Sequence, residues 1–161
     1  MRQKASFFIG INLGMDPTVA LVKDGVVLSC SEEERHMRLK HAANLYPVRA
    51  LRYCMEEANA NPEDALCVNW DIPSYTDGRM KAFYEDLRNT YDVDDNTIKW
   101  QSRNLALNNL SNFQDKHRFE WGKIFGAKAI PPIHFIGHHF VHAFQAFHQS
   151  NFDNAICVTV D

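Results

Sequence analysis

Alternating apolar and polar stretches in the N-terminal part of the chain predict three β-strands. Short apolar runs occupy residues 7–13, 18–22 and 26–30, and their lengths suit strands rather than helices. An Asp24-Gly25 pair separates the second run from the third. Because glycine tolerates the positive φ that a two-residue hairpin turn needs, this pair predicts a tight turn. We therefore expect the chain to open with a three-stranded antiparallel meander.

The next segment predicts a helix and a strand that extends the sheet. Four apolar residues recur at the spacing of one helix face: Leu51, Cys54, Met55 and Ala58. Pro47 precedes them, and proline suits a first helical position because it lacks the amide proton that this position leaves unused. A further apolar run follows at 65–70. The order of strand, helix and strand predicts a crossover to a parallel strand.

The C-terminal part predicts more helices and two more strands. Residues 71–128 are polar with scattered aromatic side chains, and helices are expected near 78–90 and 112–125. Then come a strand at 133–136, a helix from about 138 to 148 with an apolar face (Phe140, Val141, Phe144, Phe147), and a strand at 155–160. The pattern is that of an α/β fold. Because so apolar a strand normally has partners on both faces, we expect a piece of a longer protein, or a short relative of one.

Composition restricts the classes of function. The chain has 161 residues, 17 Lys and Arg against 20 Asp and Glu, a net charge of −3 and 45% hydrophobic residues. These values suit a folded domain, and they argue against general affinity for nucleic acid or anionic membranes, which needs clustered Lys and Arg. No apolar run is long enough for a signal peptide or a membrane span. The cysteines lack paired metal or redox spacing, so we expect buried, reduced thiols in a cytoplasmic protein.

Two histidines one helical turn apart suggest a metal site. His138 and His142 project from one face of the expected helix, so their imidazoles can share a metal ion. Asp161, at the end of the last expected strand, is a candidate third ligand, and two imidazoles with one carboxylate suit iron, zinc or manganese. The alternatives are packed or surface histidines and, for Asp161, an exposed terminal residue.

The segment between the first two strands is a second candidate site. It contains Asn12, Gly14 and Asp16. Its glycines let a phosphate group approach the backbone amides closely, and an ordinary hairpin connection is the alternative interpretation.

Five blocks of the sequence, in order, resemble the O-carbamoyltransferases of the nodulation and antibiotic-tailoring type. They are residues 9–25, the run Glu32-Glu33-Glu34-Arg35 with Arg38, Lys40 and His41, residues 52–58, the signature His138-His139-Phe140-Val141-His142-Ala143 with Ala146 and Phe147, and Val158-Thr159-Val160-Asp161. Residues 71–128 match least. One departure is Met15, where that family usually has a histidine that can serve as a base, since a thioether cannot take up a proton.

The resemblance implies an α/β fold of the ribonuclease-H-like, actin-like ATPase type, similar to tRNA threonylcarbamoyl-adenosine proteins. This chain would hold the first half-domain. Residues 1–154 are then expected to form the first subdomain, with a variable helical insertion at about 71–128, and residues 155–161 to begin a truncated second subdomain. A C-terminal domain that makes carbamoyl-adenylate from carbamoyl phosphate and ATP is expected beyond this chain.

The same resemblance implies transfer of the carbamoyl group to a hydroxyl of a small molecule. Asp16, Lys40 and His41 are expected to be catalytic. Asp16 could substitute as the base for the histidine that Met15 replaces, and Lys40 and His41 would contact carbamoyl phosphate or the acceptor, with a solvated charged loop as the alternative for these two. Asn12 and Gly14 are expected to bind the cofactor at the first phosphate turn. The family's divalent metal, typically iron, would be held by His138, His142 and Asp161. Alone, the chain is not expected to complete the reaction.

Two other functions stay open. A threonylcarbamoyl-transfer protein acting on tRNA would have the same fold and histidine helix, although the net charge of −3 and the lack of a basic patch argue against nucleic acid. A non-catalytic half-domain remnant is the other, and Met15 supports it.

Overall fold

A five-stranded β-sheet organises the first of the two units into which the chain folds. The computed structural model describes residues 7–43, 45–70, 81–91, 93–97, 99, 110–126 and 130–160. One unit comprises residues 1–69 and 114–135, and the other comprises residues 70–113 and 136–161. The predicted subdomains, 1–154 and 155–161, stay a prediction.

The predicted antiparallel meander is confirmed. It consists of β1 (Phe7–Asn12), β2 (Thr18–Lys23) and β3 (Val26–Glu32), paired in sequence order. The turn between β2 and β3 contains Asp24 and Gly25, with φ angles of 50° and 78°. Two successive positive φ angles are what a type I′ turn requires, and its twist matches that of the flanking strands.

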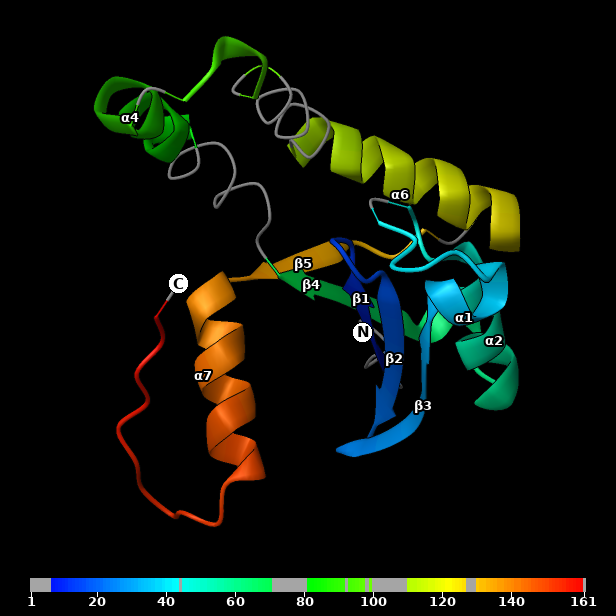
Figure 1. Cartoon of the computed structure of the whole chain (residues 1–161). Coiled ribbons are helices and arrows are strands. Elements are labelled where there is room, and N and C mark those ends of the chain that lie inside the picture. The colour runs from blue at the N-terminus through cyan, green and yellow to red at the C-terminus, as the bar shows by residue number, and fades with distance from the viewer. Residues whose placement is uncertain are drawn as a thin grey trace. The chain divides into compact units, whose positions relative to one another are not determined.

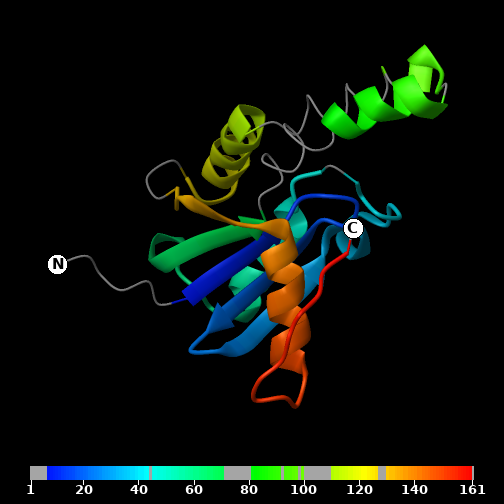
Figure 2. The ribbon, with the colours of Figure 1, turned by 90° about the vertical axis from the view of Figure 1, so that its left-hand side faces the viewer.

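The crossover to a parallel strand is also confirmed. α2 (Val48–Glu57) and a short 3₁₀ turn, η1 (Pro62–Asp64), lead to β4 (Ala65–Trp70), which pairs in parallel with β1. β5 (Ile133–Ile136) follows at the edge, so the strand order is β3-β2-β1-β4-β5. Figures 1 and 2 show β1 in the middle of the sheet, between β2 and β4.

The main core of the first unit lies where α2 contacts β2 and β3. The helix buries the face that its apolar spacing predicted, and the strands bury alternate positions: Leu51, Cys54 and Met55 on α2, and Ile9, Ile11, Val19 and Leu21 on β1 and β2. Each of the Leu, Ile, Val and Met side chains among these contributes roughly 1.5–3 kcal/mol when it is fully buried. Ser29 Oγ donates a hydrogen bond to the Cys54 carbonyl (3.0 Å), which ties β3 to the helix. Burial raises the pKa of the Cys54 thiol, so the thiol stays protonated.

A buried carboxylate at the start of α1 caps the start of α2. α1 (Glu33–Met37) is a short helix that the apolar pattern did not predict, and Glu33 is only 2% exposed. Its Oε2 accepts hydrogen bonds from the backbone N–H groups of Arg49 (3.0 Å) and Ala50 (2.8 Å). These amides lie in the first turn of α2, where no helical carbonyl is available to them. The negative charge also faces the positive end of the helix dipole, so Glu33 joins α1 to α2.

A buried histidine holds α6 (Leu110–Phe125) in place. His117 Nε2 lies 3.2 Å from the Pro131 carbonyl oxygen, and His117 Nδ1 lies 2.9 Å from the Tyr46 hydroxyl. Because a carbonyl only accepts, Nε2 carries the proton and Nδ1 of the neutral ring accepts from the tyrosine. Trp121, fully buried, packs against the same imidazole. Burial lowers the pKa of His117, which favours this neutral ring.

The predicted helices of the C-terminal part are confirmed. α4 (Lys81–Tyr91) corresponds to 78–90, α6 to 112–125, and α7 (His138–Gln149) to about 138–148. α7 differs from expectation in one respect, since none of its residues is buried and Phe140 and Phe144 are 62% and 52% exposed. None of the helices in the described ranges has the length and apolarity that crossing a bilayer needs.

The predicted strand at 155–160 is wrong. The structure has an irregular segment there, and Ile156, Val158 and Val160 are 95%, 79% and 88% exposed. A strand is stable when its backbone groups pair with a neighbouring strand and its apolar side chains are buried. Within the described part of the chain, this segment has neither form of support.

The expectation of buried thiols holds for one of the cysteines that the structure describes. Cys54 is buried, whereas Cys30, on the edge strand β3, and Cys157, in the irregular segment, are exposed. All three are free thiols, as expected.

Glu33→Gln is expected to destabilise the first unit. The amide carries no charge and keeps only one acceptor oxygen, and its NH₂ group takes the place of an oxygen that faces the backbone N–H of Arg49, so the buried hydrogen bonding is weakened at a cost of roughly 1–3 kcal/mol. Urea unfolding measures the change in unfolding free energy. Glu63→Gln, at an exposed glutamate of the same unit, is the control and should stay within about 0.5 kcal/mol of wild type. Equal stability of the Glu33→Gln and wild-type proteins would contradict the capping role.

Acidification is expected to weaken the contact made by His117. Since burial lowers the pKa of His117 below its ordinary value of 6.5, the unfolded chain takes up this proton more readily than the folded chain. The stability contributed by the neutral ring is therefore complete above pH 6.5 and is lost as pH falls below it toward the folded-state pKa.

The measurement is the unfolding free energy in urea from about pH 8 to about pH 5.5. His117→Gln should flatten the decline at low pH, whereas His134→Gln, at an exposed position on β5, should keep the wild-type slope. An unchanged slope in His117→Gln would show that another group is responsible.

Candidate functional site

Asp16 lies in the connection between β1 and β2. Its backbone carbonyl accepts two hydrogen bonds, from Asn12 Nδ2 (2.9 Å) and from Thr18 Oγ1 (2.8 Å). Because Asn12 ends β1 and Thr18 begins β2, these bonds fix the connection from both strands. The Asp16 side chain is 56% exposed, so its carboxylate is accessible to solvent.

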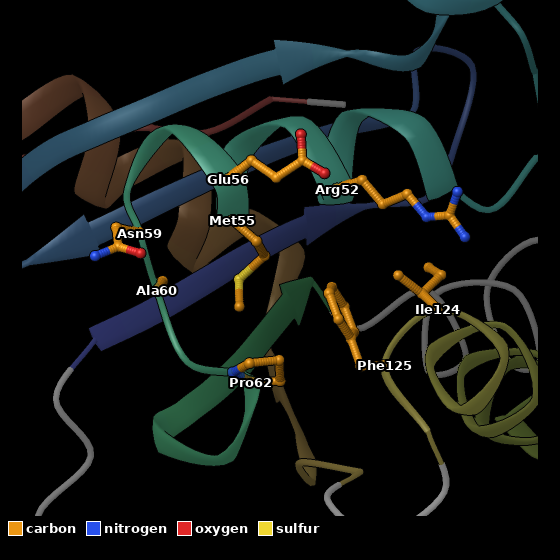
Figure 3. A pocket seen from close by; sticks show the side chains of 8 residues that line it. All are labelled: Arg52, Met55, Glu56, Asn59, Ala60, Pro62, Ile124 and Phe125. Atoms are coloured by element: carbon orange, nitrogen blue, oxygen red, sulfur yellow. The ribbon is translucent and has the colours of Figure 1, made fainter.

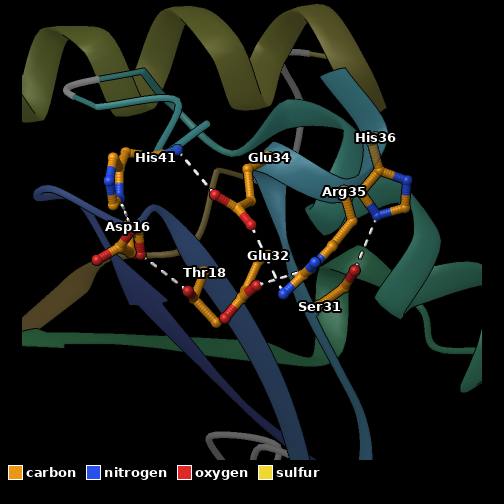
Figure 4. A network of polar contacts seen from close by, with 8 residues as sticks. All are labelled: Asp16, Thr18, Ser31, Glu32, Glu34, Arg35, His36 and His41. Carbon is orange, nitrogen blue, oxygen red and sulfur yellow. Dashed lines mark hydrogen bonds and ion pairs between the residues drawn. The ribbon is translucent and has the colours of Figure 1, made fainter. Parts of the chain in front are cut away.

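His41 reaches the Asp16 carboxylate from a separate loop. Its Nδ1 lies 2.8 Å from Asp16 Oδ1, and its backbone N–H donates to Glu34 Oε2 at 2.7 Å. Figure 4 shows the imidazole facing Asp16 while the loop backbone faces Glu34. One potential ligand atom from each of Asp16, Glu34 and His41 lies within 4.8 Å of the others. These three residues are referred to below as the acid–histidine cluster.

The loop that carries His41 is anchored at two places. One is α1, which precedes the loop, and the other is Ala42, which follows His41 directly. Before the loop, α1 is held by the Glu33 cap and by Ser31 Oγ, which lies 2.8 Å from His36 Nε2. Beyond the histidine, Ala42 is fully buried. Arg38 and Ala42 have φ angles of 54° and 42°, a left-handed backbone that costs a residue other than glycine roughly 1–2 kcal/mol. The anchors offset this cost and hold the loop in one conformation.

Arg35 offsets part of the negative charge in the cluster. Its Nη2 lies 3.6 Å from Glu34 Oε1, while its Nε donates to Glu32 Oε2 at 3.0 Å. The arginine side chain is 72% exposed, so these pairs add little to stability. The effect of Arg35 is local. It contacts one oxygen of Glu34, and the other oxygen accepts the hydrogen bond from the backbone N–H of His41.

The other residues predicted near this turn are accessible. Lys40 is exposed, and so is Met15, by 65%. A Cβ built on Gly14 would meet Asn12 Oδ1 at 3.7 Å, an ordinary contact, so packing within the chain does not demand glycine there. Phosphate binding by Asn12 and Gly14 stays a prediction, and Asn12 already uses one amide hydrogen on the Asp16 carbonyl.

The two histidines predicted to bind a metal lie close together on α7. The ring centroids of His138 and His142 are 4.6 Å apart, with the ring planes at 88°. Imidazoles one helical turn apart at this separation can direct nitrogens at one cation, so the pair fits a divalent transition metal. The predicted third ligand, Asp161, lies outside the described residues.

Sequence reasoning found Asp16 and His41 separately but did not pair them, and it assigned no role to Glu33 or Glu34. The run of acidic residues was the available signal. Its members have three different environments, since Glu33 is buried at a helix start, Glu34 lies in the cluster and Glu32 pairs with Arg35. A charged run therefore does not reveal which carboxylate faces inward.

A pocket of about 460 Å³ lies between the end of α2 and the end of α6 (Figure 3). Met55, Pro62 and Phe125 give it apolar walls, and Arg52 and Glu56 project from α2 beside them. None of the residues predicted to act on substrate or metal lines it, so it is separate from the acid–histidine cluster.

The chain is similar to one family of known proteins and to longer curated relatives. The family described as "Carbamoyltransferase N-terminus" matches residues 8–161. The chain is 30% identical over 150 residues to nodulation protein NolNO of Sinorhizobium fredii, which covers 91% of this chain and 19% of that protein. It is 32% identical over 152 residues to the uncharacterized protein sll1178 of Synechocystis sp., which covers 91% of this chain and 23% of that protein. The chain thus spans about a fifth of the length of the curated relatives it matches.

Proposed function

The chain belongs to the carbamoyltransferase family, whose N-terminal part it matches, and we propose that the protein containing it transfers a carbamoyl group to a hydroxyl of a small molecule. The observation that carries this proposal is the family match across residues 8–161. The contact of 2.8 Å between Asp16 and His41 supports it, because carbamoylation of a hydroxyl benefits from a positioned group that removes its proton.

The finer fold that we propose is the ribonuclease-H-like, actin-like ATPase fold. The strand order β3-β2-β1-β4-β5 supports it, with an antiparallel meander followed by a crossover to a parallel strand. In this proposal the described sheet belongs to the first half-domain. The greater length of the relatives is consistent with a second half-domain and a further domain that makes carbamoyl-adenylate.

The proposed co-substrates are ATP and carbamoyl phosphate, which yield carbamoyl-adenylate as the donor. We place the acceptor and the donor carbonyl beside Asp16, Lys40 and His41. Lys40 is exposed, and its charge would offset that of a phosphate group. Asn12 and Gly14, in the connection between β1 and β2, are the proposed contacts to nucleotide phosphate.

His138 and His142, with Asp161, are proposed to hold a divalent metal, with iron as the first candidate. The separation of 4.6 Å between the two imidazole rings supports a shared ion, and a mixed nitrogen and oxygen donor set suits iron. When bound, such an ion supplies positive charge that orients phosphate and carbamoyl oxygens.

A cytoplasmic location is part of the proposal. The free thiols at Cys30, Cys54 and Cys157 support it, because reducing compartments keep cysteines unpaired.

The protein that contains this chain is expected to move label from carbamoyl phosphate to a hydroxylated small molecule when ATP is present. Mass spectrometry of a panel of hydroxylated acceptors would detect the gain of one carbamoyl group. Reactions without ATP or without carbamoyl phosphate are the controls and should give no product. Product formed only on tRNA would replace the small-molecule acceptor in this proposal, and no ATP-dependent carbamoylation of any acceptor would refute it.

His138→Ala and His142→Ala are each expected to reduce the metal content of the purified full-length protein from about one equivalent to a small fraction, because each removes a ligand. Elemental analysis by mass spectrometry measures this directly. His148→Ala, at an exposed histidine on the same helix, is the control and should keep its metal. Undiminished metal in both ligand variants would remove this site from the proposal.

A further inference from the structure

We propose that His41 is the general base that deprotonates the acceptor hydroxyl, with Asp16 orienting its imidazole and Glu34 holding its backbone. This inference rests on the proposed carbamoyl transfer and names the residue that removes the proton. It makes His41 a catalytic residue and the two acids positioning residues.

The contact to Asp16 sets the state of the imidazole. His41 Nδ1 lies 2.8 Å from Asp16 Oδ1, and a carboxylate only accepts, so Nδ1 carries a proton, and in the neutral form of the ring the lone pair lies on Nε2. The His41 side chain is 48% exposed, and in the described ranges of the chain no residue hydrogen-bonds Nε2. A general base needs a fixed tautomer, an available lone pair and an accessible position. The contact with Asp16 fixes the tautomer of the neutral His41 ring, and the exposed side chain leaves its Nε2 accessible.

The backbone of His41 is positioned independently of its side chain. The His41 N–H donates to Glu34 Oε2 at 2.7 Å, and Glu34 is 22% exposed at the side chain. Since the bond uses the main chain, a substitution of the imidazole leaves it intact. A substitution at position 41 is therefore expected to keep the loop conformation, so its effect on catalysis can be separated from an effect on folding.

Three other histidines of the first unit, His36, His117 and His134, lack this combination. His36 Nε2 already lies 2.8 Å from Ser31 Oγ, and the His36 ring lies 5.4 Å from that of Tyr53. His117 is buried with both nitrogens engaged. Among the described residues, His41 is the histidine that forms an ion-pair contact with a carboxylate.

In the proposed step the acceptor hydroxyl is the nucleophile and AMP is the leaving group. The acceptor O–H bond breaks and its proton goes to His41 Nε2. The acceptor oxygen forms a bond to the carbamoyl carbon of carbamoyl-adenylate, and the bond from that carbon to the phosphate oxygen breaks. AMP leaves with the electron pair. The imidazolium lies beside the Asp16 carboxylate, which stabilises its charge, and the exposed ring then returns the proton to solvent.

The first test is His41→Asn in the full-length protein. Asparagine tolerates the left-handed φ of 65° and offers an N–H group to Asp16, but it has no basic nitrogen. The kcat for transfer should fall roughly 10²- to 10⁴-fold, with little change in the KM for the acceptor. Formation of carbamoyl-adenylate from ATP and carbamoyl phosphate should be unchanged. His134→Asn, at an exposed histidine, should behave as wild type.

The second test is chemical rescue. His41→Gly suits the positive φ and opens space beside Asp16, so added imidazole should restore transfer by roughly tenfold or more, in proportion to its concentration. Asp16→Asn should reduce kcat in the wild-type background and add no further loss to His41→Asn, because Asp16 acts through His41.

The results distinguish a failure of the proposed carbamoyl transfer from a failure of the proposed role of His41. If wild type makes no carbamoylated product, the proposed function fails. If wild type is active but His41→Asn keeps its kcat, or imidazole does not rescue His41→Gly, then His41 is not the base. Binding of Mn²⁺ to a His138→Ala/His142→Ala protein that is lost in its His41→Asn derivative would also overturn the inference, because the cluster would then be a metal site.

Discussion

The Glu33 carboxylate at the start of α2 is the contact on which the arrangement of the site depends. Glu33 is 2% exposed, and its carboxylate accepts hydrogen bonds from the backbone N–H groups of Arg49 and Ala50. A shift of α1 against α2 would leave this buried charge without partners, which is strongly unfavourable. α2 in turn packs on the meander, and the meander carries Asp16. The Asp16–His41 contact is therefore set by a chain of rigid elements rather than by the attraction between two exposed side chains.

The sheet could be predicted because its signals are local. The Asp24-Gly25 pair adopts the two positive φ angles that a tight hairpin needs, and the α2 face repeats every helical turn. α1 could not be predicted in this way, because five residues show no apolar period. What stabilises α1 is the contact from Glu33 to α2, which exists only after both helices have formed.

The segment 155–160 is the opposite case, since its sequence predicts a strand that the structure does not contain. Its apolar, β-branched residues indicate what the segment does when a partner strand is present, but sequence alone does not say whether one is. The site has a similar limit. Asp16 and His41 are 25 residues apart, and the resemblance identified both as candidates, yet only the packing of two loops against one sheet brings the carboxylate to the imidazole. The sequence therefore identifies Asp16 and His41 as residues suited to catalysis, and the fold determines that their side chains meet.

The first unit is discontinuous along the chain, which leaves after residue 69 and returns at 114. Contacts such as the one between Tyr46 and His117, 71 positions apart, join the two stretches across this excursion. Loop-closure entropy grows by only about 0.6 kcal/mol for each doubling of a connecting length. A change in the length of the excursion therefore adds little to the entropy of joining the two stretches, and their contacts, rather than the connection, hold the first unit together.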